Sequence, residues 1–287
     1  MEIVVGKLAG FCGGVINSVK KTEEFLNSNS EVYCLGELVH NKQVVDKLER
    51  MGLKTIDDLN MVPDASKVII RAHGISMETY ELAKSKQIEL YDLTCPNVLL
   101  IHDKASKLVD EGYFVVLIAK KDHPEAIGTI SFCGDNSFIL EDNSGVDDLV
   151  SLFLKSGKAK LAVISQTTYS MSRFDLLTKE IKNKLSGYDI LIDNTICSAT
   201  ELRQKETNKL SKEVDAMIII GGKNSSNTKK LFEVSSVNCN NSFIIETVND
   251  IVWDFSCYEK VGVMAGASTP KESIEEVIDF LKSIKNN

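Results

Sequence analysis

Short apolar runs rich in β-branched residues alternate along this chain with longer segments in which apolar residues recur at helical spacing. The clearest strand candidates are 68–70, 113–118 and 216–220. Uninterrupted apolar runs of this length are typical of strands covered on both faces. Segments 15–26 and 97–111 repeat apolar residues every three or four positions and predict amphipathic helices. This alternation predicts an α/β fold with mostly parallel sheets.

Three cysteines mark a threefold internal repeat. Cys12, Cys95 and Cys197 each stand where a predicted strand passes into a predicted helix. The residues 28 positions beyond them are His40, His123 and Ser225, each just after a predicted strand. A second polar loop follows in each repeat, centred on His73, Thr167 and Ser268. The spacing predicts three similar α/β units at 1–94, 95–196 and 197–287. No strand follows the last helix, so we expect the two ends of the chain, including the C-terminal helix, near each other.

Composition narrows the class of protein. The chain has 287 residues and a formal net charge of −8, which argues against a nucleic-acid partner. No apolar run approaches the ~20 residues needed to span a membrane, and no export signal is visible, so a cytoplasmic location is expected. The seven cysteines are odd in number and widely spaced, which favours metal binding or catalysis over disulfides.

The repeated cysteines point to a thiolate-bound inorganic centre. A helix N-terminus favours a thiolate, and ligand sites of parallel sheets lie at the carboxyl ends of the strands. Three thiolates facing one centre suit an iron–sulfur cluster or a metal with an open coordination position. Zinc held by three thiolates is also compatible with this pattern. The nearest histidine, His102, lies mid-helix and is expected to be structural, as are Cys34 and Cys133, while Cys239 and Cys257 fall outside the repeat.

The polar loops supply hydrogen-bond donors that suit a phosphate or diphosphate. The set contains His40, His73 and His123, with Lys223 nearby, and the hydroxyl and amide groups of Thr168, Ser225, Ser226, Asn227 and Ser268. Glu125 is the one carboxylate at the rim of this set. Burial in a site closed to water would raise the pKa of Glu125 and make it a proton donor.

In order along the whole chain, these motifs resemble the 4-hydroxy-3-methylbut-2-enyl diphosphate reductase family of the non-mevalonate isoprenoid pathway. The motifs are Gly10-Phe11-Cys12-Gly13-Gly14-Val15, Val39-His40-Asn41, Ala72-His73-Gly74, Thr94-Cys95-Pro96, His123-Pro124-Glu125, Gln166-Thr167-Thr168, Thr195-Ile196-Cys197-Ser198-Ala199-Thr200 with Arg203-Gln204, Asn224-Ser225-Ser226-Asn227 and Gly266-Ala267-Ser268-Thr269-Pro270. The resemblance implies three α/β domains in pseudo-threefold arrangement around a central 4Fe-4S cluster, with one iron free of protein ligands.

By the same resemblance, each motif residue has an expected role. Cys12, Cys95 and Cys197 would hold the cluster. The substrate would contact His40, His73, His123, Thr167, Thr168, Ser225, Ser226, Asn227 and Ser268, mainly through its diphosphate. Glu125, with Thr167 relaying, would supply protons. Two electrons from an external donor such as ferredoxin or flavodoxin would then remove the substrate hydroxyl as water, giving isopentenyl and dimethylallyl diphosphates.

Two other classes of protein remain as alternatives. One is a metal-stabilised module, with zinc as the metal, that binds a phosphosugar without redox chemistry; a brown chromophore after anaerobic purification would exclude it. The other is a thiol-dependent hydrolase that uses Cys12 with a histidine and would keep its activity after iron is removed.

Overall fold

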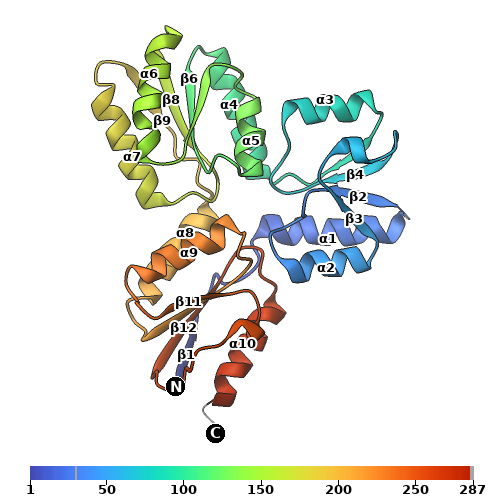
Figure 1. Ribbon diagram of the computed structural model, residues 1–287, viewed down its shortest axis with the longest axis vertical. Helices are drawn as coiled ribbons and strands as arrows, with labels where there is room; N and C mark the ends of the chain where they lie inside the picture. Colours follow the sequence, from blue (N-terminus) through green and yellow to red (C-terminus); the bar gives the residue numbers. More distant parts are fainter. Residues whose placement is uncertain (30, 285–287) are drawn as a thin grey trace. The chain divides into compact units, whose positions relative to one another are not determined.

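Twelve strands in the described residues, 1–29 and 31–284 of a computed structural model, form three four-stranded sheets (Figure 1). The strands are β1 (Glu2–Val5), β2 (Val32–Leu35), β3 (Leu53–Ile56), β4 (Lys67–Ile70), β5 (Glu89–Asp92), β6 (Phe114–Ile118), β7 (Ser137–Leu140), β8 (Lys160–Ser165), β9 (Asp189–Ile192), β10 (Ala216–Ile220), β11 (Ser242–Ile245) and β12 (Lys260–Ala265). Every strand pair in these sheets is parallel. The predicted α/β fold class is confirmed.

All three sheets share one strand order, which is the structural form of the threefold repeat. The orders are β3-β2-β4-β5, β7-β6-β8-β9 and, read in the same direction, β11-β10-β12-β1. The fourth strand of the last sheet comes from the N-terminus, because Ile3 pairs with Val261 and Val5 pairs with Val263. The two ends of the chain therefore complete one sheet, as the missing final strand led us to expect.

Helices connect the strands. They are α1 (Gly13–Ser28), α2 (Lys42–Arg50), α3 (Met77–Ser85), α4 (Pro96–Asp110), α5 (Pro124–Ser131), α6 (Val146–Ser156), α7 (Met171–Lys184), α8 (Ser198–Leu210), α9 (Ser226–Ser236) and α10 (Lys271–Ile284). Short 3-10 turns occupy Leu59–Met61, Asn143–Gly145 and Val248–Asp250. Parallel strands need such crossover connections, since a tight turn cannot join them.

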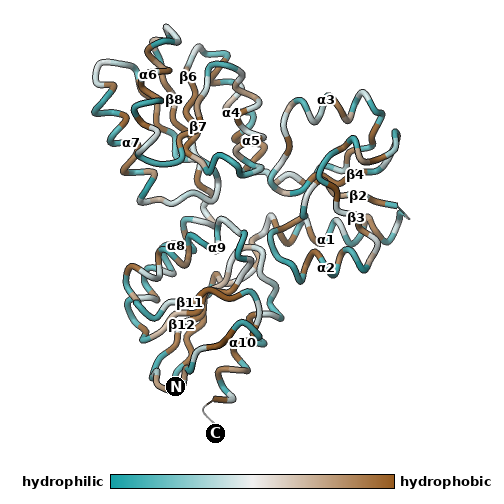
Figure 2. Tube along the Cα trace, in the orientation of Figure 1, coloured by the Kyte–Doolittle hydropathy of each residue, from teal (hydrophilic) through white to brown (hydrophobic). Residues whose placement is uncertain are grey.

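The sheet of β6 to β9 shows why its strands read as continuous apolar runs. Phe114, Val116 and Ile118 face the side covered by α6 and α7. Val115 and Leu117, between them in sequence, face the side covered by α4 and α5. Successive side chains of a strand point to opposite faces, so a strand covered on both faces must be apolar at every position. Figure 2 shows these strands as hydrophobic segments among more polar helices.

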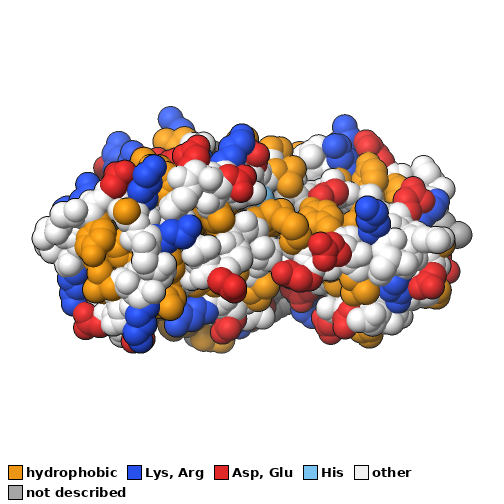
Figure 3. Space-filling view, turned by 90° about the horizontal axis from the view of Figure 1, so that it is seen from above, with side chains coloured by type: hydrophobic (Ala, Val, Ile, Leu, Met, Phe, Trp, Pro, Cys, Tyr) orange, Lys and Arg blue, Asp and Glu red, His pale blue; other side chains and the backbone are white. Residues whose placement is uncertain are grey.

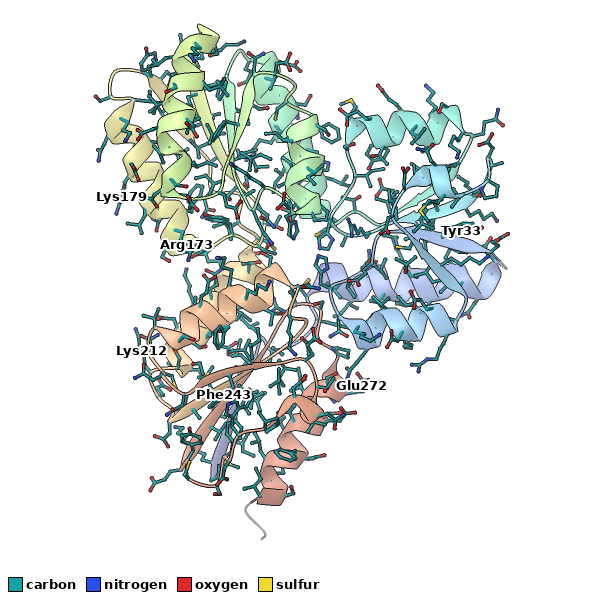
Figure 4. The ribbon with its side chains drawn as sticks, viewed as in Figure 1. Tyr33, Arg173, Lys179, Lys212, Phe243 and Glu272 are labelled. Carbon is teal, nitrogen blue, oxygen red and sulfur yellow. The ribbon has the colours of Figure 1, made fainter. Side chains whose placement is uncertain are left out.

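The sheet that contains both chain ends is layered in the same way. Ile218 and Ile220 of β10 pack with Val277 and Leu281 of α10, in a cluster that Met1 and Ile3 also contact. The opposite face packs against α8 and α9. Phe243 of β11, labelled in Figure 4, lies with its ring centroid 4.5 Å from that of Trp253. The C-terminal helix thus packs beside the N-terminal strand.

The backbone contacts divide the chain into two compact units. Unit 1 comprises Met1–Lys20, Val39–Met51 and Ser198–Asn287, and unit 2 comprises Lys21–Leu38 and Gly52–Cys197. Unit 1 holds one of the sheets and unit 2 the other two. The boundaries 1–94, 95–196 and 197–287 stay a prediction.

The surface and the helices carry two further observations. On the face presented in Figure 3, Lys and Arg side chains are interspersed with Asp and Glu, as is typical of a solvated surface. In the part of the chain that the structure describes, no helix has both the length and the apolar character needed to span a membrane.

Candidate functional site

The same main-chain hydrogen bond anchors each of the three repeat cysteines. Cys12 N–H donates to the Ala267 carbonyl at 3.1 Å, Cys95 N–H to Ala72 at 3.0 Å, and Cys197 N–H to Thr167 at 3.0 Å. The acceptors belong to the second polar loops of the repeat. Each cysteine is therefore fixed against one such loop at the carboxyl end of its sheet.

These bonds also show which loops accompany each cysteine. Counting forward along the chain associates Cys12 with His40 and His73, but Cys12 follows β1 and is bonded to the loop after β12. Cys95 is the cysteine bonded to the loop that contains His73. Each cysteine thus follows the edge strand of a sheet, and the two inner strands of that sheet lead into the polar loops. In the last sheet this edge strand is β1, from the N-terminus. Because β1, the first strand of the chain, belongs to the last sheet, spacing along the sequence does not show which loop each cysteine contacts.

The three cysteines differ chemically from the others. Cys12, Cys95 and Cys197 form no disulfide, are partly exposed, and each lies immediately before the first residue of α1, α4 or α8. The unpaired N–H groups of a helix start stabilise a thiolate. Burial instead raises the pKa of both Cys34 and Cys133 to about 12, which leaves these two thiols protonated. Only thiols of the first kind suit metal coordination.

Within unit 2, Asn97 links two of these cysteine loops. Its Nδ2 donates to Cys197 Sγ at 3.1 Å, and Asn97 lies two residues after Cys95 at the start of α4. This bond joins the first turn of α4 to the Cys197 side chain. Asn97 is not among the residues expected at the site, because its position in the first turn after Cys95 is that of an ordinary helix-start residue.

Glu125 is a buried carboxyl held by a single residue. Its side chain lies in the first turn of α5 and is 2% exposed. Thr167 donates to it twice, from its N–H at 2.6 Å and from its hydroxyl at 2.7 Å. Burial raises the pKa of Glu125 to about 7, although the two hydrogen bonds from Thr167 act in the opposite direction. A carboxyl with this pKa is partly protonated at neutral pH and can donate a proton.

Two histidine rings lie close to each other in unit 2, and one of them belongs to the N-cap of the helix that carries Glu125. His123 is the N-cap of α5, and its Nδ1 accepts from the Glu125 N–H at 3.2 Å. That bond assigns the proton of a neutral His123 to Nε2. The His73 and His123 rings are 5.2 Å apart in an edge-on arrangement. Thr168 completes this set, and its hydroxyl accepts from Gln166 Nε2 at 3.1 Å, which leaves the hydroxyl proton to donate.

Unit 1 gathers a second set of polar groups. Ser268 donates to the His40 carbonyl at 3.2 Å. Ser225 caps α9 by accepting from the Thr228 N–H, so its own hydroxyl proton stays available. Ser226 begins that helix, and Asn227 follows with a side chain only 4% exposed. Lys223, by contrast, is exposed and pairs with Asp250 at 3.6 Å.

Asn227 has a buried side-chain amide in the first turn of α9. Neither its Oδ1 nor its Nδ2 has a hydrogen-bond partner among the described residues, although both atoms are buried. Leaving a buried polar group unsatisfied costs about 1–3 kcal/mol. An anion at the start of α9 would accept from Nδ2 and from the helix N–H groups.

His102 is buried on the inward face of α4, as its helical position predicts. The ring stacks on Phe132 at 4.6 Å, and a Cβ at Gly74 would lie 2.8 Å from its Cε1. Gly74, with φ +74°, is therefore both sterically and conformationally required beside it. Burial lowers the pKa of His102 to about 4, partly offset by the charge of Asp92. His102 is thus neutral at physiological pH.

This low pKa predicts a pH-dependent stability. Below the ordinary histidine pKa of 6.5 the unfolded chain takes up a proton that folded His102 rejects until about pH 4. The His102 contribution to the free energy of unfolding should therefore fall as pH drops from 6.5 to 4, by about 3 kcal/mol in total. Urea titrations of wild type and His102→Phe test this. The difference between the two curves should have this slope, whereas parallel curves would contradict it.

The fold and these residues define a class: an α/β protein of three parallel four-stranded sheets with one strand order, each sheet followed by a cysteine at a helix start. The chain belongs to the LytB family. The family model described as LytB protein matches residues 3–282.

Curated relatives and solved structures agree with this family. The chain is 40% identical to the 4-hydroxy-3-methylbut-2-enyl diphosphate reductase of Alkaliphilus oremlandii (strain OhILAs), covering 99% of this chain and 100% of the relative. It is 39% identical to the enzyme of the same name from Geobacter sulfurreducens, covering 100% and 99%. The fold is similar to the E-1-hydroxy-2-methyl-but-2-enyl-4-diphosphate reductase structure from Plasmodium falciparum, with TM-score 0.92, 33% identity and coverage of 98% and 88%. A structure of (E)-4-hydroxy-3-methyl-but-2-enyl diphosphate reductase gives TM-score 0.70 and 36% identity, covering 99% and 100%.

Proposed function

We propose that this chain reduces (E)-4-hydroxy-3-methylbut-2-enyl diphosphate to isopentenyl and dimethylallyl diphosphates. Family membership and near-full-length relatives of that name support the reaction. The observation in the structure that carries the proposal is the double hydrogen bond from Thr167 to the buried Glu125, since Thr167 also accepts from the Cys197 N–H. One residue therefore joins the proton donor to a cysteine loop.

The cofactor belongs to the same proposal. Cys12, Cys95 and Cys197 would together hold a 4Fe-4S cluster with one iron free of protein ligands. The fit rests on three cysteines outside disulfides in equivalent backbone settings at helix starts, and on the hydrogen bond that Cys197 Sγ accepts from Asn97. When bound, such a cluster supplies electrons and a Lewis-acidic iron.

The remaining polar residues would bind and orient the substrate. The proposed set is His40, His73, His123, Thr167, Thr168, Ser225, Ser226, Asn227 and Ser268. Neutral donors and helix N–H groups bind a diphosphate without the large desolvation cost of burying several cations. The unsatisfied amide of Asn227 supports a diphosphate contact at the start of α9. Glu125 would then deliver its proton to the departing hydroxyl, and Thr167 would hold the carboxyl in place.

The electrons would come from a separate protein. We propose a small carrier such as ferredoxin or flavodoxin, because the quoted motifs include no nicotinamide or flavin fingerprint. We also propose a cytoplasmic location.

The direct test is anaerobic purification followed by metal analysis and a turnover assay. We expect about four irons and four sulfides per chain, and release of both isoprenoid diphosphates with a reduced carrier or dithionite and a mediator. Zinc without iron would favour the zinc-stabilised binding module instead. Hydrolytic activity that survives iron removal would favour the thiol-dependent hydrolase.

A substitution at Asn227 tests the diphosphate contact separately. Asn227→Ala should raise KM and the substrate Kd about 10- to 100-fold, because a hydrogen bond to a charged group contributes about 1.5–3 kcal/mol. The iron content should not change. Asn240→Ala, an exposed amide beyond the same helix, is the matched control. Unchanged affinity in Asn227→Ala would remove Asn227 from the site.

A further inference from the structure

Helix α8 holds the segment that leads from β1 to Cys12. The N–H groups of Lys7 and Leu8 donate to the two carboxylate oxygens of Glu206, at 2.7 and 2.9 Å. A carboxylate that accepts two successive main-chain donors fixes both position and orientation. The side chain is partly exposed, so this contact lies toward the surface of unit 1.

Arg203 makes the second attachment, about one turn earlier on the same helix. Its Nη2 donates to the Gly10 carbonyl at 2.8 Å and its Nη1 to the Ala199 carbonyl at 3.0 Å. The side chain is only 4% exposed. Gly10 lies two residues before Cys12, so the planar guanidinium joins the cysteine loop to the helix backbone by two directed bonds.

The opposite side of the loop is fixed as well. Gly10 has φ +97°, and a Cβ there would lie 3.3 Å from the Thr269 carbonyl oxygen. Cys12 itself donates to the Ala267 carbonyl. The loop is therefore held by α8 through Arg203 and Glu206, and by the 267–269 segment through Cys12.

Helix α8 also begins directly after Cys197 in the chain. Its first residue follows one proposed ligand, while Arg203 and Glu206 hold the loop of another.

We infer that Arg203 and Glu206 are positioning residues for Cys12, which hold its loop in the geometry that binds the inorganic group. This inference rests on the proposed function, because it assumes that Cys12 is a ligand. Pre-organised ligands lose metal more slowly, since release requires the loop to move, and outer contacts of this kind are worth 10–100-fold in affinity. Without Arg203, the loop could move Cys12 away from the inorganic group more readily, although the sheet beneath the loop would be unchanged.

The test follows cluster loss from the anaerobically loaded full chain after addition of a ferrous chelator. Arg203→Met and Glu206→Gln should each lose the cluster absorbance at least about tenfold faster than wild type. Arg203→Lys keeps the charge and one donor nitrogen but not the two-nitrogen fork, so its rate of cluster loss should lie between those of wild type and Arg203→Met. The electron paramagnetic resonance spectrum of the reduced cluster should change in Arg203→Met and shift back toward wild type in Arg203→Lys. Lys205→Met, an exposed change on the same helix, should match wild type.

Melting of the metal-free proteins separates positioning from folding. The inference expects the metal-free variants to melt within a few degrees of wild type while cluster loss accelerates. Wild-type loss rates in both Arg203→Met and Glu206→Gln would overturn it, as would acceleration that matches a fall in metal-free melting temperature. If Arg203→Met does not fold, Glu206→Gln decides alone. A wild-type chain that takes up no iron would contradict the proposed function instead.

Discussion

Replacing Glu125 with Gln should lower kcat about 10²- to 10⁴-fold, the usual contribution of a positioned proton donor. Glutamine keeps the size of the side chain and can still accept from Thr167, so the surrounding loops should stay in place. It carries no acidic proton. Iron content and substrate Kd should therefore remain near wild type, and single-turnover assays on reduced enzyme should show the loss in the chemical step.

The pH dependence gives a second readout of the same group. Because burial raises the pKa of Glu125 to about 7, its protonated fraction falls as pH rises through 7. The kcat/KM of wild type, which reports groups of the free enzyme, should fall in the same range, and Glu125→Gln should lack this fall. Thr167→Val removes the hydroxyl bond that lowers the pKa of Glu125, so the fall in kcat/KM should move to higher pH in this variant. Equal losses of substrate affinity and turnover in Glu125→Gln would count against a proton-donor role.

Replacing Cys197 with Ser should remove the cluster and the activity together. A serine hydroxyl is a far weaker ligand for iron than a thiolate, because it does not ionise at neutral pH. Anaerobic iron and sulfide analysis should show a loss of most of the metal, and turnover should fall to background.

The matched control for Cys197 is an exposed cysteine outside the repeat. Cys257→Ser changes the same atom in a thiol that is exposed and bonded to the Asp254 carbonyl. It should keep wild-type iron content and turnover. Full iron content and activity in Cys197→Ser would refute the assignment of this residue as a ligand.

The layers of the fold were predictable because burial on both faces of a parallel strand leaves a local signature. Residues 68–70, 114–118 and 216–220 are apolar without a break, and each became a central strand. The absence of a strand after the last helix likewise predicted that the two ends of the chain lie near each other, and β1 pairs with β12.

The candidate site was only partly visible in the sequence. The helix-start positions of the three cysteines follow from local pattern, whereas the loop that each contacts depends on how the repeat closes. Arg203 meets Gly10 across 193 positions and Glu206 meets Lys7 across 199, so no local spacing relates them. Asn97 looks like an ordinary helix-start residue until its contact with Cys197 is seen. Such contacts arise from the tertiary fold.

Iron-edge anomalous diffraction from crystals of the anaerobically loaded protein tests the central claim most directly. The account predicts one compact iron cluster bonded to Cys12, Cys95 and Cys197, with one iron that no side chain of the chain reaches. Iron bound at separate positions, or a cluster that lacks any one of these three sulfurs, would contradict it.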